Sequence, residues 1–179
     1  ADKGPSVLVV ATAEAHDTEL AWRIERHREE RPKTWKTVEE PHDVLGVLRE
    51  NSDYSVVVID CITMLVSNWL FSSPEVQRLG ADPPARAELL ALEERVGKLV
   101  ERARKLGEAA AALDNQVIMV TNEVGLGLIP PNPLSRMYRD VLGRINRVLA
   151  EQAEQVLFMV SGLPWCIKPE PGGGPLPGS

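Results

Sequence analysis

Three short runs of consecutive apolar, mostly β-branched residues constrain the fold of this chain more than any other feature. They span residues 6–12, 55–60 and 116–121, and charged amphipathic stretches of helical periodicity lie between them. Continuous apolar runs of this length are typical of strands in a parallel sheet, because helices cover both faces of such a sheet. The alternation of strands with helices predicts an α/β fold with a mostly parallel sheet flanked by helices.

The other elements are expected from their hydrophobic periodicity and from residues that typically begin or end helices and strands. Further strands are expected at 35–39, 155–160 and 165–168, and loops at 72–84 and 122–131. One helix is opened by Asp17 and stopped by Pro32, and others are expected over 43–50, 62–71, 85–113 and 133–155. Residues 1–168 thus form a single domain. Residues 169–179, rich in Pro and Gly, cannot pack a core and are expected to be a flexible tail or linker.

Composition limits the possible functions. At 179 residues and 44% hydrophobic content, the chain is long enough for one buried core. A net charge of −6 argues against a nucleic-acid partner or an anionic membrane surface. No apolar run reaches the roughly 18 residues of a membrane span, and no leader peptide is expected. Cys61 and Cys166 are expected to be reduced thiols, so a cytoplasmic location is predicted.

Polar residues follow each of the three apolar runs. Thr12 ends the first run and is followed by Ala13 and Glu14, Asp60 ends the second, and Asn122 follows the third. Because the carboxyl ends of parallel strands line a common crevice, these residues predict a ligand site there. Four apolar residues followed by Asp60 also form a Walker B arrangement, in which the carboxylate orients Mg²⁺ bound to nucleotide phosphates. A simple helix cap is the alternative interpretation of Asp60.

One histidine lies within a cluster of arginines in the first expected helix. His27 is surrounded by Arg23, Arg26, Arg28 and Arg31. Guanidinium groups suit phosphate oxygens, and they favour a neutral imidazole by repelling its protonated form. A neutral histidine beside a bound phosphate could act as a nucleophile. The alternative is a solvated helix whose glutamates pair with the arginines and whose histidine is half-buried.

Several segments together resemble a known family. They are 24–35, 60–71, 120–130, 138–146 and 160–162, and they occur in order from about Ser6 to Lys168. The most specific are the Thr-Asn-Glu-Val-Gly run at 121–125 and the His-x-x-x-Arg-Pro-x-x-Trp run that begins at His27. The chain resembles the bifunctional adenosylcobinamide kinase/adenosylcobinamide-phosphate guanylyltransferase family of cobalamin biosynthesis.

This resemblance implies a P-loop NTPase-like fold of the RecA type that assembles into a homo-oligomer, typically a trimer. It also implies phosphorylation of adenosylcobinamide with GTP or ATP, followed by transfer of GMP from GTP through a GMP-histidine intermediate to give adenosylcobinamide-GDP. By resemblance, His27 carries the GMP and Asp60 holds Mg²⁺, although some relatives have Glu at that position. The nucleotide contacts implied in the same way are Thr12, Ala13, Glu14, Arg28, Glu29, Glu30, Arg31, Glu39 and Asp60.

The chain departs from the family in one large respect. Members have a strand, a Gly-x-x-x-x-Gly-Lys-Ser phosphate loop and a helix ahead of the segment equivalent to Ser6, and no such loop occurs in these 179 residues. Gly97-Lys98 has no glycine at the required earlier position. An omitted segment ahead of residue 1 is the simplest hypothesis, since without the loop neither kinase activity nor efficient guanylyl transfer is expected.

Two alternatives remain, the first suggested by this departure and the second by the strand that ends on Asp60 and the long helix after it. The first is a catalytically impaired nucleotide-binding remnant or scaffold of the same fold. The second is a recombinase-type P-loop ATPase, which predicts stimulation by DNA and is disfavoured by the net charge.

Overall fold

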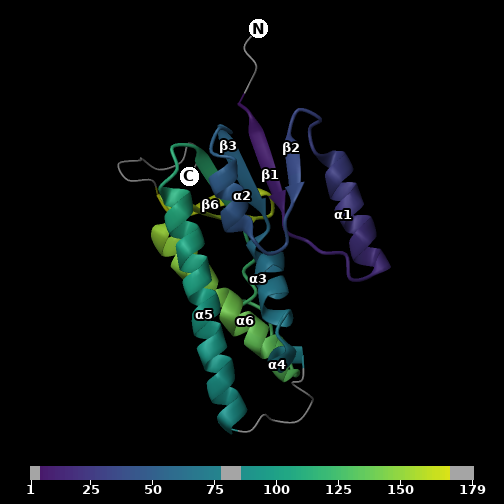
Figure 1. Cartoon of the computed structure of the whole chain (residues 1–179), viewed down its shortest axis with the longest axis vertical. Helices are drawn as coiled ribbons and strands as arrows, with labels where there is room; N and C mark the ends of the chain where they lie inside the picture. Colours follow the sequence, from purple (N-terminus) through teal and green to yellow (C-terminus); the bar gives the residue numbers. More distant parts are fainter. Residues whose placement is uncertain (1–4, 78–85, 170–179) are drawn as a thin grey trace.

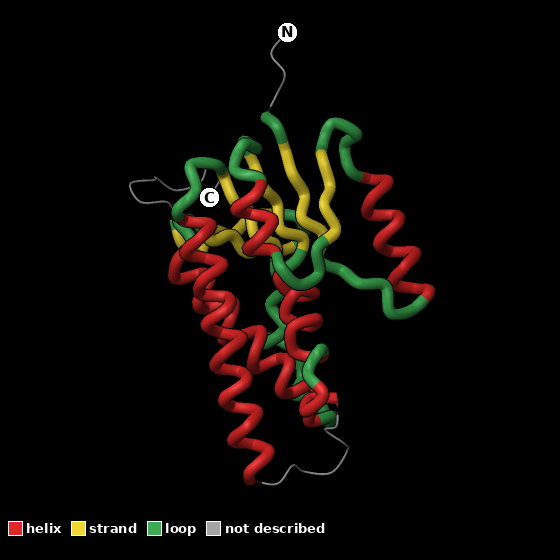
Figure 2. Tube along the Cα trace, viewed as in Figure 1, coloured by secondary structure: helices red, strands yellow, loops and turns green. Residues whose placement is uncertain are grey.

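The computed structural model describes residues 5–77 and 86–169. Four parallel strands form the main sheet in the order β2-β1-β3-β4, and two further strands form a separate antiparallel pair (Figures 1 and 2). In chain order the elements are β1 Val7–Ala11, α1 Thr18–Glu30, β2 Lys36–Glu39, α2 Val44–Glu50, β3 Val56–Asp60, α3 Ile62–Phe71, α4 Pro74–Gln77, α5 Arg86–Ala111, β4 Gln116–Val120, α6 Pro133–Gln152, β5 Val156–Val160 and β6 Leu163–Lys168. The predicted α/β class, with a mostly parallel sheet flanked by helices, is confirmed.

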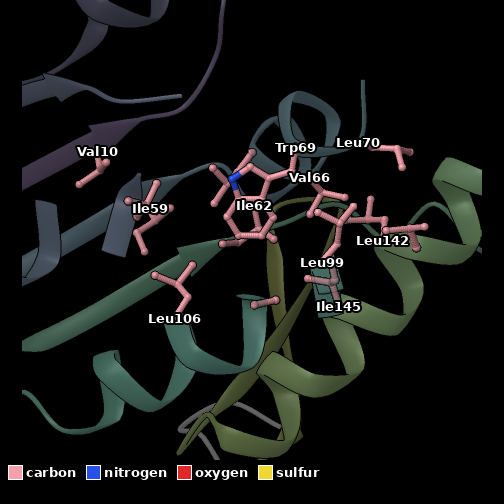
Figure 3. Packing of buried hydrophobic residues seen from close by; sticks show 14 of the residues in the cluster. Val10, Ile59, Ile62, Val66, Trp69, Leu70, Leu99, Leu106, Leu142 and Ile145 are labelled. Carbon is pink, nitrogen blue, oxygen red and sulfur yellow. The ribbon is translucent and has the colours of Figure 1, made fainter. Parts of the chain in front are cut away.

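The core lies between one face of the sheet and helices α2, α3, α5 and α6. Figure 3 shows Val10 and Ile59 of the sheet, Ile62, Val66 and Trp69 of α3, Leu99 and Leu106 of α5, and Leu142 and Ile145 of α6. All of these side chains are buried. Burial of this apolar surface contributes roughly 25 cal/mol per Å² to folding, and it fixes β3 and α3 firmly relative to each other.

The opposite face of the sheet is progressively exposed toward β4. Strand β1 is buried throughout, β3 alternates buried and half-buried residues, and β4 alternates half-buried and exposed residues. Ile118 and Val120 are both 42% exposed. The run at 116–121 forms the predicted strand, but the prediction that this strand is buried is wrong. Strand β4 lies at the edge of the sheet, and among the described residues its second edge has no strand partner.

Strands β5 and β6 differ from the expected continuation of a parallel sheet. They pair only with each other, through a turn at Ser161 and Gly162, both of which have positive φ (52° and 79°). Two consecutive left-handed residues make a two-residue hairpin turn whose twist matches antiparallel strands. The sequence contains a signal for this turn, because serine-glycine pairs are typical of turns.

Several element boundaries differ from the prediction, including that of β6, which begins at Leu163 rather than 165. The expected loop at 72–84 contains the short helix α4, and residues 78–85 lie outside the described residues. Helix α6 ends at Gln152 rather than 155, because Ala153 is already extended. Helix α5 ends at Ala111. The predicted tail is described only at Pro169, since residues 170–179 lie outside the described residues.

Helix α1 is placed differently from the other long helices. It lies beside the edge strand β2, on the side of the molecule away from α5 and α6 (Figure 1). None of its residues is buried. It is therefore outside the core, although it carries the arginine-flanked histidine. Within the described ranges, no helix has both the length and the hydrophobicity needed to cross a bilayer.

Candidate active site

The carboxyl ends of the central strands bring the predicted crevice residues together. Ala11, the last residue of β1, is in register with Glu39 of β2 and Asp60 of β3, and Asp60 is in register with Val120 of β4. The chain leaves this edge through Thr12, Glu40 and Cys61. Residues far apart in sequence thus meet along one edge of the sheet, as the strand pattern predicts.

Thr12 closes the gap between β1 and β3. Its buried hydroxyl donates to the Cys61 carbonyl (2.7 Å) and accepts from the Cys61 amide (2.9 Å), while its own amide donates to the Asp60 carbonyl (3.0 Å). Both hydrogen-bonding capacities of the hydroxyl are therefore used within the protein. The structure thus gives Thr12 a positioning role at the strand ends, and Ala13 and Glu14 beside it are half-buried.

Asn68 has a similar role that was not predicted from the sequence. It is buried on α3, and its Nδ2 donates to the carbonyls of Thr12 (2.8 Å) and Pro41 (3.0 Å). It thereby fixes the chain where it leaves β1 and where it follows β2. The available signal was a polar amide among the apolar residues of 62–71, because buried amides are retained where they satisfy backbone groups.

Asp60 forms an ion pair with Arg31 at the end of β3. The Arg31 Nη2 lies 3.1 Å from Asp60 Oδ2, and the two side chains are 17% and 37% exposed. No group of three or more His, Cys, Asp or Glu side chains that could hold a metal occurs in the part of the chain that the structure describes. A single carboxylate is still compatible with Mg²⁺. Proteins usually bind this ion through one or two carboxylates, and substrate phosphates and water complete the shell. Asp60 is the residue that would hold it.

A second ion pair joins α1 to the sheet. Arg28 donates to the Glu39 carboxylate at the end of β2, and both side chains are more than half exposed. Arg28 and Arg31 thus connect the last turn of α1 to the ends of two different strands. This brings four of the predicted nucleotide contacts, Arg28, Arg31, Glu39 and Asp60, into one group.

His27 lies on the exposed surface of the same helical turn. It lines a surface hollow of about 390 Å³ together with Glu19, Trp22, Arg23, Arg26 and Glu30. Among the described residues it has no hydrogen-bond or ion-pair partner, while Glu30 pairs with Arg26 (3.0 Å) and Glu29 is exposed. An imidazole without a partner has its lone pair available, which a nucleophile requires.

Glu14 lies between two histidines after β1. Its carboxylate oxygens are 3.8 Å from Nε2 of His16 and 3.7 Å from Nε2 of His42, so each forms an ion pair only when the histidine is protonated. His16 is exposed and His42 is half-buried.

The loop after β4 is tied to α3 and α6. The Asn122 amide donates to the Thr63 hydroxyl (2.9 Å), and Asn146 Nδ2 donates to the Asn122 carbonyl (3.1 Å). The Tyr138 hydroxyl donates to the Thr63 carbonyl (3.0 Å). Burial, with a smaller contribution from Cys61, raises the pKa of Tyr138 to about 12, so this donor is retained across the neutral range. Burial also raises the pKa of the Cys61 thiol.

Comparison with known proteins shows which family shares this pattern. A family model described as cobinamide kinase / cobinamide phosphate guanyltransferase matches residues 1–167. The chain is 36% identical over 172 residues to the bifunctional adenosylcobalamin biosynthesis protein CobP of Pseudomonas aeruginosa, covering 96% of this chain and 87% of that protein.

Two enterobacterial proteins of similar name match almost as well. The bifunctional adenosylcobalamin biosynthesis protein CobU of Escherichia coli is 35% identical over 158 residues, covering 88% of this chain and 83% of that protein. CobU of Salmonella typhimurium is 34% identical over 161 residues, covering 89% and 84%. These matches, together with the arrangement of the strand ends, show that the chain belongs to the cobinamide kinase/cobinamide phosphate guanyltransferase family.

Proposed function

We propose that this chain transfers GMP from GTP to adenosylcobinamide phosphate through a covalent GMP intermediate on His27, and that it also serves as an adenosylcobinamide kinase. The placement of His27 carries the proposal. It is an unpartnered, exposed imidazole on the helical turn whose Arg28 and Arg31 pair with Glu39 and Asp60 at the strand ends. The family description and the names of the relatives support the two activities.

The transfer would proceed in two displacements at one phosphorus atom. In the first, a ring nitrogen of His27 attacks the α-phosphorus of GTP, a P–N bond forms, and the P–O bond to pyrophosphate breaks. In the second, a phosphate oxygen of adenosylcobinamide phosphate attacks the same phosphorus and the P–N bond breaks. The electron pair of that bond returns to the imidazole, and adenosylcobinamide-GDP leaves. Covalent catalysis divides one difficult transfer into two easier ones.

Arg28 and Arg31 would stabilise the negative charge of the phosphates. Both are committed to carboxylates, so nucleotide binding exchanges those partners for phosphate oxygens. Guanidinium groups bind such oxygens through two parallel hydrogen bonds. The exchange would free the Asp60 carboxylate, which would hold Mg²⁺ in the bound state. Mg²⁺ supplies further neutralisation of the phosphates.

The kinase step is proposed for the same crevice, with GTP or ATP as phosphoryl donor. Phosphoryl transfer in this fold class depends on a glycine-rich loop that cradles the phosphates, and residues 1–179 contain none. The kinase proposal therefore requires a phosphate loop in addition to the residues described above. We also propose that the protein is cytoplasmic and that it forms a homo-oligomer, a trimer by resemblance. Sedimentation of the purified protein tests the assembly.

The test is the intact mass of the protein before and after incubation with GTP and Mg²⁺. We expect a GMP-sized increase in the wild-type chain that His27→Ala abolishes and that the control His16→Ala retains. Mapping of chymotryptic peptides should place the label on the peptide 23–35, which contains His27. Reversible GTP binding without a label would instead support a binding remnant or scaffold, and would contradict guanylyl transfer by this chain.

A further inference from the structure

The segment that connects β4 to α6 presents large apolar side chains to solvent. We call residues 122–131 the strand-end loop. Leu126, Leu128 and Ile129 within it are 79%, 96% and 74% exposed. Single exposed apolar residues are common on protein surfaces, but a cluster of three within one short loop is typical of a binding surface. The proposed mechanism does not use these side chains.

Two arginines of α6 hold the main chain of this loop in place. Arg139 donates to the carbonyls of Gly125 (3.1 Å) and Leu128 (3.4 Å), and Arg136 donates to those of Pro130 (3.0 Å) and Pro131 (2.6 Å). The loop cannot fold back to bury its own apolar side chains without breaking these hydrogen bonds. The exposed apolar surface is therefore a fixed feature of the loop, and a ligand would find it preorganised.

The same arginines bring positive charge to the loop. Both are half-buried, and neither forms an ion pair with a carboxylate in residues 5–77 and 86–169. A guanidinium group has five N–H donors, so each arginine keeps donors that the loop carbonyls do not use. Such donors suit phosphate and carbonyl oxygens. The strand-end loop thus fits a large ligand that combines apolar surface with oxygen acceptors.

The loop lies on the opposite side of Asp60 from the helix that carries His27. It begins beside Asp60, because the Asn122 amide donates to the hydroxyl of Thr63 (2.9 Å) in the first turn of α3. The strand order β2-β1-β3-β4 places this loop after β4, whereas α1 lies beside β2 (Figure 1). A phosphate held at Asp60 would have α1 on one side and the strand-end loop on the other.

The stereochemistry of the proposed transfer determines from which side the acceptor enters. Displacement at phosphorus is in line, so the entering and leaving groups occupy opposite positions. Pyrophosphate leaves on the side opposite the His27 nitrogen, and the acceptor oxygen must enter at the position that pyrophosphate vacates. The bulk of the acceptor therefore lies on the side away from α1, which is the side of the strand-end loop.

We infer that the strand-end loop binds the corrin macrocycle of adenosylcobinamide and of its phosphate. The inference rests on the proposed function. Leu126 and Leu128 contact the apolar part of the macrocycle, and Arg136 and Arg139 donate to the amide carbonyls around it. An oxygen of the acceptor phosphate then bonds to the phosphorus, the P–N bond breaks, and its electron pair returns to the imidazole. Because both substrates carry the same macrocycle, the same surface serves the kinase step.

Equilibrium dialysis of adenosylcobinamide and of its phosphate, without nucleotide, tests this assignment. We expect Leu126→Ser and Leu128→Ser each to weaken the binding of both compounds roughly fivefold, the effect of losing one partly buried leucine contact. Both side chains are largely exposed, so neither change should affect folding. Where the wild type forms the GMP label, the concentration of adenosylcobinamide phosphate that gives half-maximal removal of the label should rise by the same factor.

Two matched controls replace exposed leucines elsewhere on the surface. Leu163→Ser lies on β6 and Leu90→Ser on α5, where the side chains are 71% and 66% exposed. Neither should change the affinity for either compound by more than about twofold. Unchanged binding by the two loop variants would overturn the assignment, as would an equal loss in the controls. Weaker binding of the phosphate alone would also overturn it, because the macrocycle is common to both compounds.

Failure of the proposed function can be told apart from failure of this inference. Dialysis requires no nucleotide, so absence of a GMP label contradicts guanylyl transfer and leaves the macrocycle site to be judged by binding alone. No binding of adenosylcobinamide by the wild type overturns the inference. If the loop variants change sedimentation and leave dialysis unchanged, the strand-end loop contacts a second copy of the chain and the assignment is wrong.

Discussion

Helices α1 and α3 are close in length but are held in place by different forces. Helix α3 spans ten residues, of which seven are buried, and it packs against α5, α6 and the sheet. Helix α1 spans thirteen residues, none of which is buried, and ion pairs join it to the ends of β2 and β3. One helix is fixed by apolar contacts and the other by charge.

This difference matches the role that we propose for each helix. Helix α3 begins directly after Asp60 and carries Asn68, so its rigidity preserves the geometry of the strand ends. Helix α1 carries His27, which in the proposed mechanism accepts a group from one substrate and passes it to another. Ion pairs at a surface can exchange partners without disturbing a core. The comparison predicts that equivalent changes in the two helices will have unequal effects.

The largest difference is expected for loss of an apolar side chain. Leu65 of α3 is fully buried, so Leu65→Ala should lower the free energy of unfolding by about 2–5 kcal/mol. Ile24 of α1 is half-buried outside the core, so Ile24→Ala should cost less than about 1 kcal/mol. Urea unfolding followed by circular dichroism measures both. Equal losses in the two variants would show that α1 belongs to the core after all.

Much of this arrangement could be predicted from local sequence signals. The apolar runs located β1, β3 and β4, and the polar residues that follow them indicated a shared crevice, which the strand register confirms. Helix α3 has the predicted bounds. Asp17 was expected to open α1, and it caps the helix by accepting from the Leu20 amide (2.7 Å). These features depend on residues near one another in the chain.

Other features depended on partners that the sequence pattern does not reveal. The apolar run of β4 resembles that of β1, yet Ile118 and Val120 are exposed because strand order places β4 at the edge. Helix α1 lies beside β2 (Figure 1) and outside the core, which its local sequence did not indicate. The pairing of Arg31 with Asp60 joins residues 29 positions apart. Periodicity indicates which side of an element is apolar, but not which element covers it.

Helix capping provides a second, smaller test of the comparison. Asn132 caps α6 by accepting from the amides of Leu134 (2.7 Å) and Ser135 (3.3 Å), and Asp17 caps α1 in a similar way. Removal of such a cap typically costs about 0.5–2 kcal/mol. Because α6 is packed in the core, Asn132→Ala should lower the free energy of global unfolding by about 1 kcal/mol.

Asp17→Ala should behave differently, although it removes the same kind of cap. Because α1 is outside the core, we expect it to open locally, with faster amide hydrogen exchange across α1 and a change in global unfolding below about 0.3 kcal/mol. Hydrogen exchange with mass spectrometry resolves the two helices. A large global loss from Asp17→Ala, or unchanged exchange in α1, would contradict the view that α1 is an independent unit.

A last comparison separates the two ion pairs that hold α1. A double-mutant cycle with Arg31→Gln and Asp60→Asn should give a coupling of about 1 kcal/mol, since this pair is partly shielded from water, and the Arg28–Glu39 pair should give roughly 0.3 kcal/mol. Amide exchange of α1 at low salt supplies the opening free energies. Raising the salt to roughly 1 M should nearly eliminate the second coupling and reduce the first only in part, because shielded charges are screened less. A larger coupling for Arg28–Glu39 would reverse this order. It would mean that β2, rather than the Asp60 end of β3, determines where His27 is held.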